Sequence, residues 1–202
     1  MAESLRTVKR IGIAGAGGIG GFVARFIFDY GAMRNQFPFN TMDIKIFDDD
    51  TVDASNLLHQ DFTQEDLGKS KCEIMANRYA LTPVSRFMTT ADFKDFDVVF
   101  SCVDSMTFRK DLYTYGFDHP ELFWIDGRCN SRSIGLFNSN VPRKNLERAL
   151  SDSTERKGCL RQVDKDKKIS HATPVIVAGM ITQCFLNWLR GENMTQESIM
   201  MI

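Results

Sequence analysis

The chain has 202 residues, of which 43% are hydrophobic and 25% are charged, and its net charge is −1 at pH 7. This composition is typical of a globular domain, and a nearly neutral chain has no general attraction to nucleic acid or to an anionic membrane. The longest apolar stretch, residues 174–181, is too short to span a bilayer, and the N-terminal residues lack the apolar core of a secretory signal. We therefore expect a single domain over residues 1–202 in the cytoplasm, with neither a nucleic-acid nor a membrane partner.

The cysteines are odd in number, and no two of them are spaced as a C-x-x-C pair. This pattern argues against a disulfide framework and against a tetrahedral zinc site. Cys102 and Cys184 lie inside apolar runs, which predicts that they are small core residues.

Hydrophobic periodicity predicts strands and helices that alternate along the first half of the chain. The first predicted helix has apolar residues at Phe22, Val23, Phe26 and Ile27, which is the spacing of one helix face. In chain order we predict a strand over residues 8–14, a glycine-rich turn over 15–20, a helix over 21–31, a strand over 42–48, a helix over 68–80 and a weaker strand over 84–88.

The second half continues the alternation with more strongly apolar strands. We predict strands over residues 96–102, 122–126 and 134–138, a helix over 106–115 and a long helix over 174–191. Thr173 and Pro174 supply an N-cap and a first-turn proline for the long helix, and Gly191 supplies its stop. The alternation predicts an α/β fold with a Rossmann-like open, mostly parallel sheet and helices on both faces.

The region before the long helix differs from the rest of the chain. Residues 143–168 contain nine Lys or Arg and five Asp or Glu, with few apolar residues. We therefore predict a charged, mobile loop at about residues 143–170. The helix that follows is apolar on most sides, so it packs either in a core or against another subunit.

Three glycines, Gly15, Gly17 and Gly20, fit the pattern G-x-G-x-x-G between a predicted strand and a predicted helix. Glycine permits the tight turn and the close approach of a phosphate to backbone amides, and the start of the helix favours the anion. Asp48 ends the next strand, where an acid normally holds a ribose hydroxyl. Together these features predict nucleotide binding, and by themselves they suit a nicotinamide oxidoreductase equally well.

Four polar residues, Asn56, Gln60, Lys71 and Asp104, decide between two nucleotide chemistries. A dehydrogenase has no need of them around the phosphates, whereas a nucleotidyl transferase must neutralise a triphosphate and hold a magnesium ion. Taken singly, Asn56 is more simply a turn cap, Lys71 a solvated helix charge and Asp104 a cap for the following helix. Taken together, they favour the nucleotidyl transferase.

The stretches GAGGIG, DDDTVDASNLLHQ, GKSK and DVVFSCVDSMTFR make the sequence similar to the ThiF/MoeB/HesA family, the prokaryotic relatives of ubiquitin-activating enzymes. The resemblance extends over residues 11–128 and, more loosely, over the predicted helix at 174–191. It implies binding of ATP and Mg²⁺ without zinc, with Lys71 and Gln60 at the phosphates and Asp104 as the magnesium ligand. It implies that the other cofactor-binding residues are Gly15, Gly17, Gly18, Gly20, Asp48, Asp50, Ser55, Asn56, His59 and Ser105.

The sequence departs from the family pattern at its cationic positions. His59 stands where the family usually has arginine, which is always charged, whereas histidine is neutral near pH 7 unless a partner raises its pKa. The family's N-terminal helix, which supplies an arginine to the partner subunit, is missing or reduced. Arg109 and Arg128 are further cationic candidates, with an ion pair to an acid as the alternative role of Arg109.

Cys159 lies in the predicted charged loop, in a region where thioester-forming relatives often place a nucleophilic cysteine. The neighbouring Arg156, Lys157 and Arg161 would favour its thiolate by lowering the thiol pKa. The resemblance thus makes Cys159 a candidate catalytic residue, and an ordinary exposed thiol is the alternative.

These observations predict an ATP-dependent adenylyltransferase that activates the C-terminal carboxylate of a small ubiquitin-like or sulfur-carrier protein or of a peptide, and that releases pyrophosphate. The family usually forms homodimers, so we expect a homodimer. The main alternative is a nucleotide-binding but non-catalytic or half-active subunit of a heteromeric activating complex. A nicotinamide oxidoreductase is the third hypothesis, because fold alone does not set function.

Overall fold

A computed structural model gives the structure of the chain and describes residues 5–151, 166–194 and 197–201. Within these ranges, seven strands form one sheet in the order β3-β2-β1-β4-β5-β6-β7. The strands are β1 (Arg10–Ala14), β2 (Asp43–Phe47), β3 (Thr82–Val84), β4 (Val98–Ser101), β5 (Phe123–Asn130), β6 (Ser133–Asn138) and β7 (Glu197–Met201). The α-helices are α1 (Gly18–Phe28), α2 (Lys71–Tyr79), α3 (Met106–Asp118), α4 (Arg143–Ser151) and α6 (Thr173–Leu189).

Strands β3, β2, β1, β4 and β5 are parallel to one another. Strand β6 pairs antiparallel with β5, and β7 pairs antiparallel with β6. The central strand β1 pairs on both sides, so that Ile11 lies opposite Ile44 in β2 and Val98 in β4. Residues from Ile11 to Ala14 are all buried, because helices cover both faces of a parallel sheet. The predicted α/β fold with a Rossmann-like, mostly parallel sheet is confirmed.

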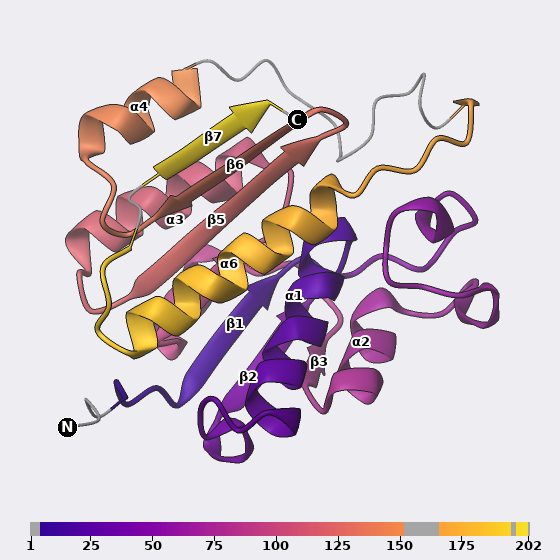
Figure 1. The fold of residues 1–202 in the computed structure, drawn as a ribbon, viewed down its shortest axis with the longest axis horizontal. Coiled ribbons are helices and arrows are strands. Elements are labelled where there is room, and N and C mark those ends of the chain that lie inside the picture. The colour runs from indigo at the N-terminus through magenta and orange to yellow at the C-terminus, as the bar shows by residue number, and fades with distance from the viewer. Residues whose placement is uncertain (1–4, 152–165, 195–196, 202) are drawn as a thin grey trace.

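Two hydrophobic clusters lie on opposite faces of the sheet. One cluster includes Val23 of α1, Met75 of α2 and Phe185 of α6. The other includes Leu112 of α3 and Leu146 of α4. Figure 1 shows α6 and α1 in front of the sheet and α3 behind it, which confirms the prediction of helices on both faces.

The prediction of a loop from residue 143 was wrong for its first part, because Arg143–Ser151 is the helix α4. Its anchor is Leu146, which is buried in the same cluster as α3, and Arg143 and Glu147 form an ion pair at 3.4 Å one turn apart. Leu146 and Leu150 have the spacing of one helix face, but the many charged residues around them led the sequence-based prediction to a loop. Residues 152–165, which include Cys159, lie outside the described residues, and the role of this cysteine stays a prediction.

The ends of several elements also differ from the sequence-based prediction. Strand β7 was not predicted, and the weaker strand expected at 84–88 is instead β3, Thr82–Val84. Helix α2 begins only at Lys71, since Gly68 has a φ of +77° that interrupts the helical pattern. Thr173 is the first residue of α6 rather than its cap, and Ala172 occupies the cap position.

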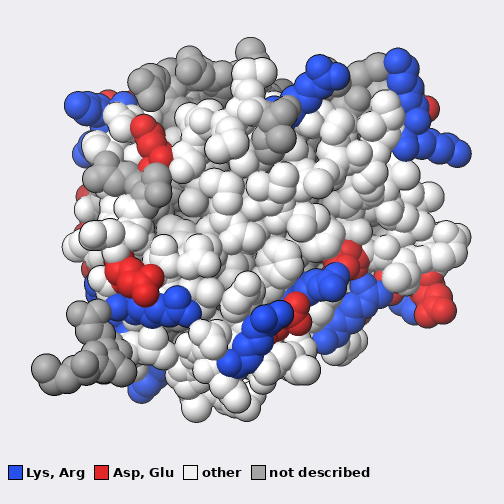
Figure 2. All heavy atoms as spheres, in the orientation of Figure 1, with Lys and Arg blue, Asp and Glu red and all other residues white. Residues whose placement is uncertain are grey.

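Figure 2 shows the face with α6 and α1, which is largely uncharged over α6, while Lys, Arg, Asp and Glu form a band across the lower part of the view and further groups at its margins. Helix α6 contributes Phe185 and Ile181 to the core, while Val175 and Ile176 are exposed. Packing in this chain's own core therefore explains most of the apolar character of α6. Among the described residues, no helix is both long enough and apolar enough to cross a membrane.

Candidate functional site

A cleft of about 800 Å³ lies at the carboxyl ends of the parallel strands. Ligands of open α/β sheets bind at this edge, because the loops that leave the strands converge there. The predicted site residues that line the cleft are Gly15, Gly17, Gly18, Asp48, Asp50, Ser55, Asn56, His59, Gln60, Lys71, Asp104 and Ser105. The fold thus brings together residues from the ends of β1, β2 and β4 and from the start of α2.

The glycine turn between β1 and α1 has two positions that require glycine. Gly15 has a φ of +91°, and a Cβ there would lie 3.0 Å from the Cys102 carbonyl oxygen. A Cβ on Gly20 would lie 1.8 Å from the Gly15 carbonyl oxygen, so Gly20 is needed for packing behind the turn. Gly17 occupies the N-cap of α1 without a capping side chain, and the cleft therefore meets the helix start where amide groups favour an anion.

Asp48 holds the glycine turn to the end of β2. Its carboxylate accepts hydrogen bonds from the Ala16 amide at 2.6 Å and from the Asp50 amide at 2.9 Å. Burial raises the pKa of Asp48, while these two amides act in the opposite direction. Each carboxylate oxygen has a second acceptor position, so Asp48 can brace the turn and still accept from a ribose hydroxyl.

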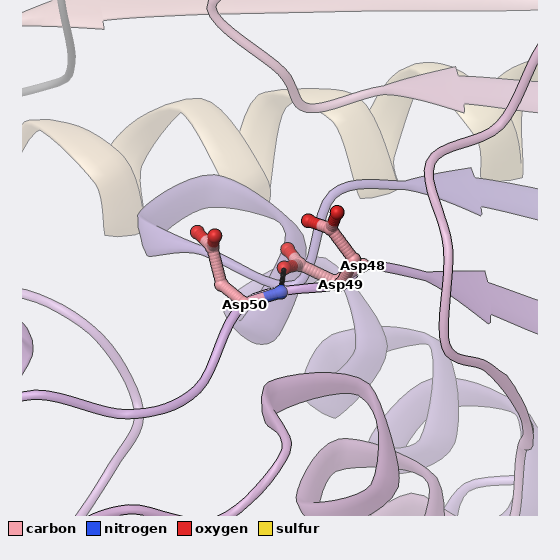
Figure 3. Close-up of side chains that lie close together, drawn as sticks. All are labelled: Asp48, Asp49 and Asp50. Carbon is pink, nitrogen blue, oxygen red and sulfur yellow. Dashed lines mark hydrogen bonds between the residues drawn. The ribbon is translucent and has the colours of Figure 1, made fainter.

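The three consecutive acids Asp48, Asp49 and Asp50 lie close together, with carboxylate oxygens within 4.8 Å of one another. Figure 3 shows them just beyond the end of β2, with the Asp50 amide bonded to Asp48. Lys71 offsets part of this charge, since its Nζ donates to Asp50 Oδ2 at 2.8 Å. The Lys71 side chain is nearly buried, whereas that of Asp50 is 59% exposed. The acid triplet thus has a cationic partner from the first turn of α2.

Asn56 and its neighbours form another part of the cleft wall. Asn56 is buried in a short 3₁₀ turn, and its Oδ1 accepts from the Asp53 amide at 3.0 Å. The alternative prediction that Asn56 stabilises a turn is therefore confirmed, and the residue also lines the cleft. Gln60 Nε2 lies 3.4 Å from His59 Nε2, and the buried Gln60 Oε1 has no hydrogen-bond partner among the described residues.

Asp104 and Ser105 lie in the loop between β4 and α3. Ser105 is the N-cap of α3, because its Oγ accepts from the Phe108 amide at 3.2 Å. Asp104 therefore does not cap this helix, and that alternative is wrong. It is an exposed carboxylate on the wall of the cleft that also contains the glycine turn and Lys71.

Sequence reasoning missed a buried charge network centred on Asp126 in β5, the strand that pairs with β4. Asp126, at 0% exposure in β5, accepts from Arg109 Nε at 3.1 Å and from Arg128 Nε at 2.8 Å. It also accepts from Ser101 Oγ at 2.8 Å and from the Tyr113 hydroxyl. Asp126 ends the apolar run LFWID much as Asp48 follows IKIF, and that repeated pattern was the available signal.

The network keeps its groups in defined charge states. Desolvation opposes ionisation of Asp126, but the positive charges of Arg109 and Arg128 hold the pKa of this carboxyl below its usual value. Burial raises the pKa of Tyr113 well above its usual value, so the phenol stays neutral. Arg109 also donates from Nη2 to the Val103 carbonyl at 2.5 Å, which fixes the residue before Asp104. The predicted alternative that Arg109 pairs with an acid is therefore correct.

The fold and the cleft define a Rossmann-like α/β protein with a candidate nucleotide site at the carboxyl edge of its sheet. The model of the ThiF family matches residues 2–201, and the chain therefore belongs to the ThiF family. A comparison with curated proteins gave no match.

Solved structures of two proteins show a similar fold. PaaA has 16% sequence identity and a TM-score of 0.67 over 96% of this chain and 69% of its own. MccB from E. coli has 14% identity and a TM-score of 0.67 over 98% of this chain and 60% of its own. The structure of E. coli MccB with ATP has 13% identity and a TM-score of 0.65. The chain thus spans 60% of the length of MccB, and at these identities the likeness shows a shared fold.

Proposed function

We propose that this chain is an ATP-dependent adenylyltransferase that joins AMP to the C-terminal carboxylate of a peptide or small carrier protein. The observation behind this proposal is that the glycine turn, Lys71 and Asp104 line one cleft, in a chain of the ThiF family. The structure of MccB with ATP supports a nucleotide as the ligand of the shared fold. Family membership argues against the nicotinamide oxidoreductase.

In the proposed complex the nucleotide lies along the carboxyl edge of the sheet. Asp48 accepts from a ribose hydroxyl, and the phosphates lie over the amides at the start of α1, beside Gly17 and Gly18. Lys71 exchanges its partner Asp50 for a phosphate oxygen, which costs little because Asp50 is largely solvated. Ser55, Asn56 and Ser105 shape the walls of the pocket.

The residues of the cleft fit a magnesium ion. Asp104 is an exposed carboxylate on the cleft wall, and magnesium is commonly held by one or two carboxylates together with substrate phosphates. When bound, the ion would neutralise negative charge on the polyphosphate. Arg109 positions the Asp104 loop through its bond to the Val103 carbonyl.

The proposed step is an in-line displacement at the α-phosphate. A carboxylate oxygen of the acceptor forms a bond to the α-phosphorus, the bond to the bridging oxygen of the β-phosphate breaks, and pyrophosphate leaves. The acceptor is already ionised at neutral pH, so no general base is needed. Lys71 and Gln60 stabilise the charge that develops on the phosphate oxygens.

The class of acceptor remains part of the proposal. The structures of E. coli MccB with MccA support a peptide acceptor, while the family resemblance also suggests a small ubiquitin-like or sulfur-carrier protein. A homodimer is likewise proposed from the family. Cys159 would serve only in a later step, in which its thiolate displaces AMP from the acyl adenylate to form a thioester.

A second candidate is a nucleotide-binding subunit that needs a cation from another chain. It is favoured because His59 replaces the family's arginine, and because Arg109 and Arg128, which also line the cleft, both pair with Asp126. Calorimetry with Mg-ATP measures binding, and ATP–pyrophosphate exchange measures turnover. Binding without exchange for any acceptor favours this second candidate.

The experiment that tests the main proposal is the Asp104→Ala substitution. We expect exchange between ATP and labelled pyrophosphate to fall on the order of a hundredfold or more, since one electrostatic group at the reacting phosphates is removed. Asp118→Ala, at an exposed aspartate at the end of α3, is the matched control and keeps wild-type exchange. Unaltered exchange in Asp104→Ala contradicts the assignment.

A further inference from the structure

One part of the cleft lies beyond the residues assigned to the nucleotide. We call it the β5–β7 arm and define it by Arg128, Phe137 and Ile199, which all line the cleft. They share one face of the sheet, because Gly135 pairs with both Arg128 and Ile199 and lies two residues before Phe137. Phe137 is buried in β6, while Ile199 in β7 is 65% exposed. The arm therefore combines one cation with an apolar wall, unlike the polar wall near the glycine turn.

Along the edge of the sheet from β2 toward β7, this arm comes next after Asp104, the proposed magnesium ligand. Asp48 follows β2, the glycine turn follows β1, Asp104 follows β4, and Arg128 lies in β5, the next strand in the sheet. Neighbouring strands are about 4.8 Å apart, so β5 lies roughly 14 Å from β2, the ribose end of the proposed nucleotide. Moving along this edge from the ribose, the next group after the phosphates and Asp104 is Arg128.

Arg128 is fixed before any ligand arrives. Its Nε donates to Asp126 at 2.8 Å, and its Nη2 donates to the Tyr113 hydroxyl at 2.6 Å. Its guanidinium also lies 4.6 Å from the centre of the Phe137 ring. A cation held by buried partners needs little ordering when it binds an anion, so its position favours recognition at low entropic cost.

We propose that Arg128 binds the C-terminal carboxylate of the acceptor peptide, and that the apolar wall of the β5–β7 arm contacts the residues before it. This inference rests on the proposed function, and it assigns the acceptor subsite within it. The acceptor carboxylate must approach an anionic α-phosphate, and a nearby guanidinium reduces the repulsion between the two anions. Arginine is suited to this task because its planar fork matches carboxylate geometry.

A phosphate of the nucleotide is the other anion that Arg128 could bind. The glycine turn, Lys71 and Asp104 already provide groups for the polyphosphate on the opposite part of the cleft. Phe137 and Ile199, on the same face as Arg128, offer no donors to phosphate oxygens, but the exposed Ile199 offers contact area to a peptide side chain. These features favour the acceptor carboxylate over the phosphate.

The test uses two pools of synthetic hexapeptides, one with free C-terminal carboxylates and one with C-terminal amides. Wild-type protein should give ATP–pyrophosphate exchange with the free-acid pool and none with the amide pool. Arg128→Gln should reduce exchange about tenfold or more through a higher KM for peptide, since a charge-assisted bond is lost, while the Kd for Mg-ATP stays within about twofold. Arg128→Lys should restore part of the exchange, and Arg132→Gln, at an exposed arginine in the β5–β6 turn, is the charge-matched control.

A second pair of variants avoids the buried network. Ile199→Asp places a negative charge in the arm and should raise the KM for the free-acid pool about tenfold, because like charges repel. Met200→Asp is its control, since successive side chains of a strand point to opposite faces and Met200 is also exposed. Both sites are exposed, so both variants should fold.

The outcomes separate this inference from the proposed function. Equal weakening of Mg-ATP binding and exchange in Arg128→Gln would show that the arginine holds the nucleotide, and it would overturn the carboxylate subsite. Equal exchange with both peptide pools also overturns it. Wild-type protein that binds Mg-ATP without exchange, or that does not bind Mg-ATP, contradicts the proposed adenylyl transfer itself.

Discussion

The two ends of the cleft hold their cations in opposite ways. At one end, Lys71 pairs with Asp50, whose side chain is 59% exposed. At the other end, Arg128 pairs with Asp126, which has no exposed side-chain surface and also pairs with Arg109. An ion pair with a solvated partner contributes little to stability, whereas removal of one partner from a buried pair is strongly destabilising. The comparison teaches that Lys71 can change partners while Arg128 is held in place.

The acids at the two ends differ in the same sense. Asp48 and Asp126 both lie at or just beyond the apolar part of a parallel strand, and both are buried. Burial raises the pKa of Asp48, which accepts from the backbone amides of Ala16 and Asp50, whereas two guanidinium groups overcome desolvation and lower the pKa of Asp126. Both acids are buried at similar places in a strand, so the two guanidinium groups beside Asp126 account for the opposite directions of the two pKa shifts.

The largest expected effect is on the fixed end of the cleft. Asp126→Asn leaves the buried Arg109 and the largely buried Arg128 without their shared carboxylate, and we expect the free energy of unfolding to fall by about 3–5 kcal/mol. Urea denaturation followed by circular dichroism measures this change. Asp118→Asn, at an exposed position of α3, is the control and should change stability by less than about 0.5 kcal/mol. A similar small loss in Asp126→Asn would contradict the view that this network is a rigid anchor.

The next effect concerns the exchangeable end. Lys71→Gln removes a cation from the proposed phosphate site, and we expect the Kd for Mg-ATP, measured by calorimetry, to rise about tenfold or more. Lys69→Gln is the matched control, because Lys69 is an exposed lysine two positions earlier. Equal affinities in the two variants would mean that the phosphates do not contact Lys71. The exchangeable ion pair of Lys71 would then have no role in binding the nucleotide.

The smallest effect concerns an ion pair that lies outside both ends of the cleft. Arg86 forms a two-pronged pair with Asp92, at 2.6 and 2.8 Å, and this pair lowers the pKa of Asp92 to about 2. A lowered carboxyl pKa contributes stability that is present above the unfolded pKa, near 4, and is lost as pH falls from about 4 to 2. Because Arg86 is half exposed, we expect only about 1 kcal/mol.

The measurement for this pair is urea denaturation of wild type and Asp92→Asn at several pH values. Wild type should be about 1 kcal/mol more stable than the variant at pH 6, and the difference should shrink as the pH approaches 2. A difference that stays constant over this range would mean that Asp92 acts through its hydrogen bonds to Thr89 alone.

Much of the site was predictable because its motifs are short in sequence. The glycine turn, the acid triplet and the run from Ser55 to Gln60 each lie between one strand and one helix, and each contributes residues that line the cleft. The local roles of individual residues in these motifs were less predictable. The structure shows Asn56 as a turn-holding residue and Ser105, rather than Asp104, as the cap of α3.

The unpredicted features depend on contacts between distant parts of the chain. Strand β7 forms by pairing with β6, so that Met201 lies opposite Ser133, and Asp126 meets Ser101 across a separation of 25 residues. Helix α4 depends on the burial of Leu146 against residues near α3. No local pattern encodes these pairings, because they form only when the sheet is assembled.

The sequence by itself determined the α/β class, the nucleotide turn and the similarity to the ThiF family, because helix and strand periods and the glycine turn are properties of neighbouring residues. The tertiary structure alone decided that Lys71 neutralises Asp50, that Arg109 and Arg128 share Asp126, and that an apolar arm extends the cleft toward β7. The physical reason is that charge pairing and desolvation act through space over a few ångströms, and only the assembled sheet sets those distances.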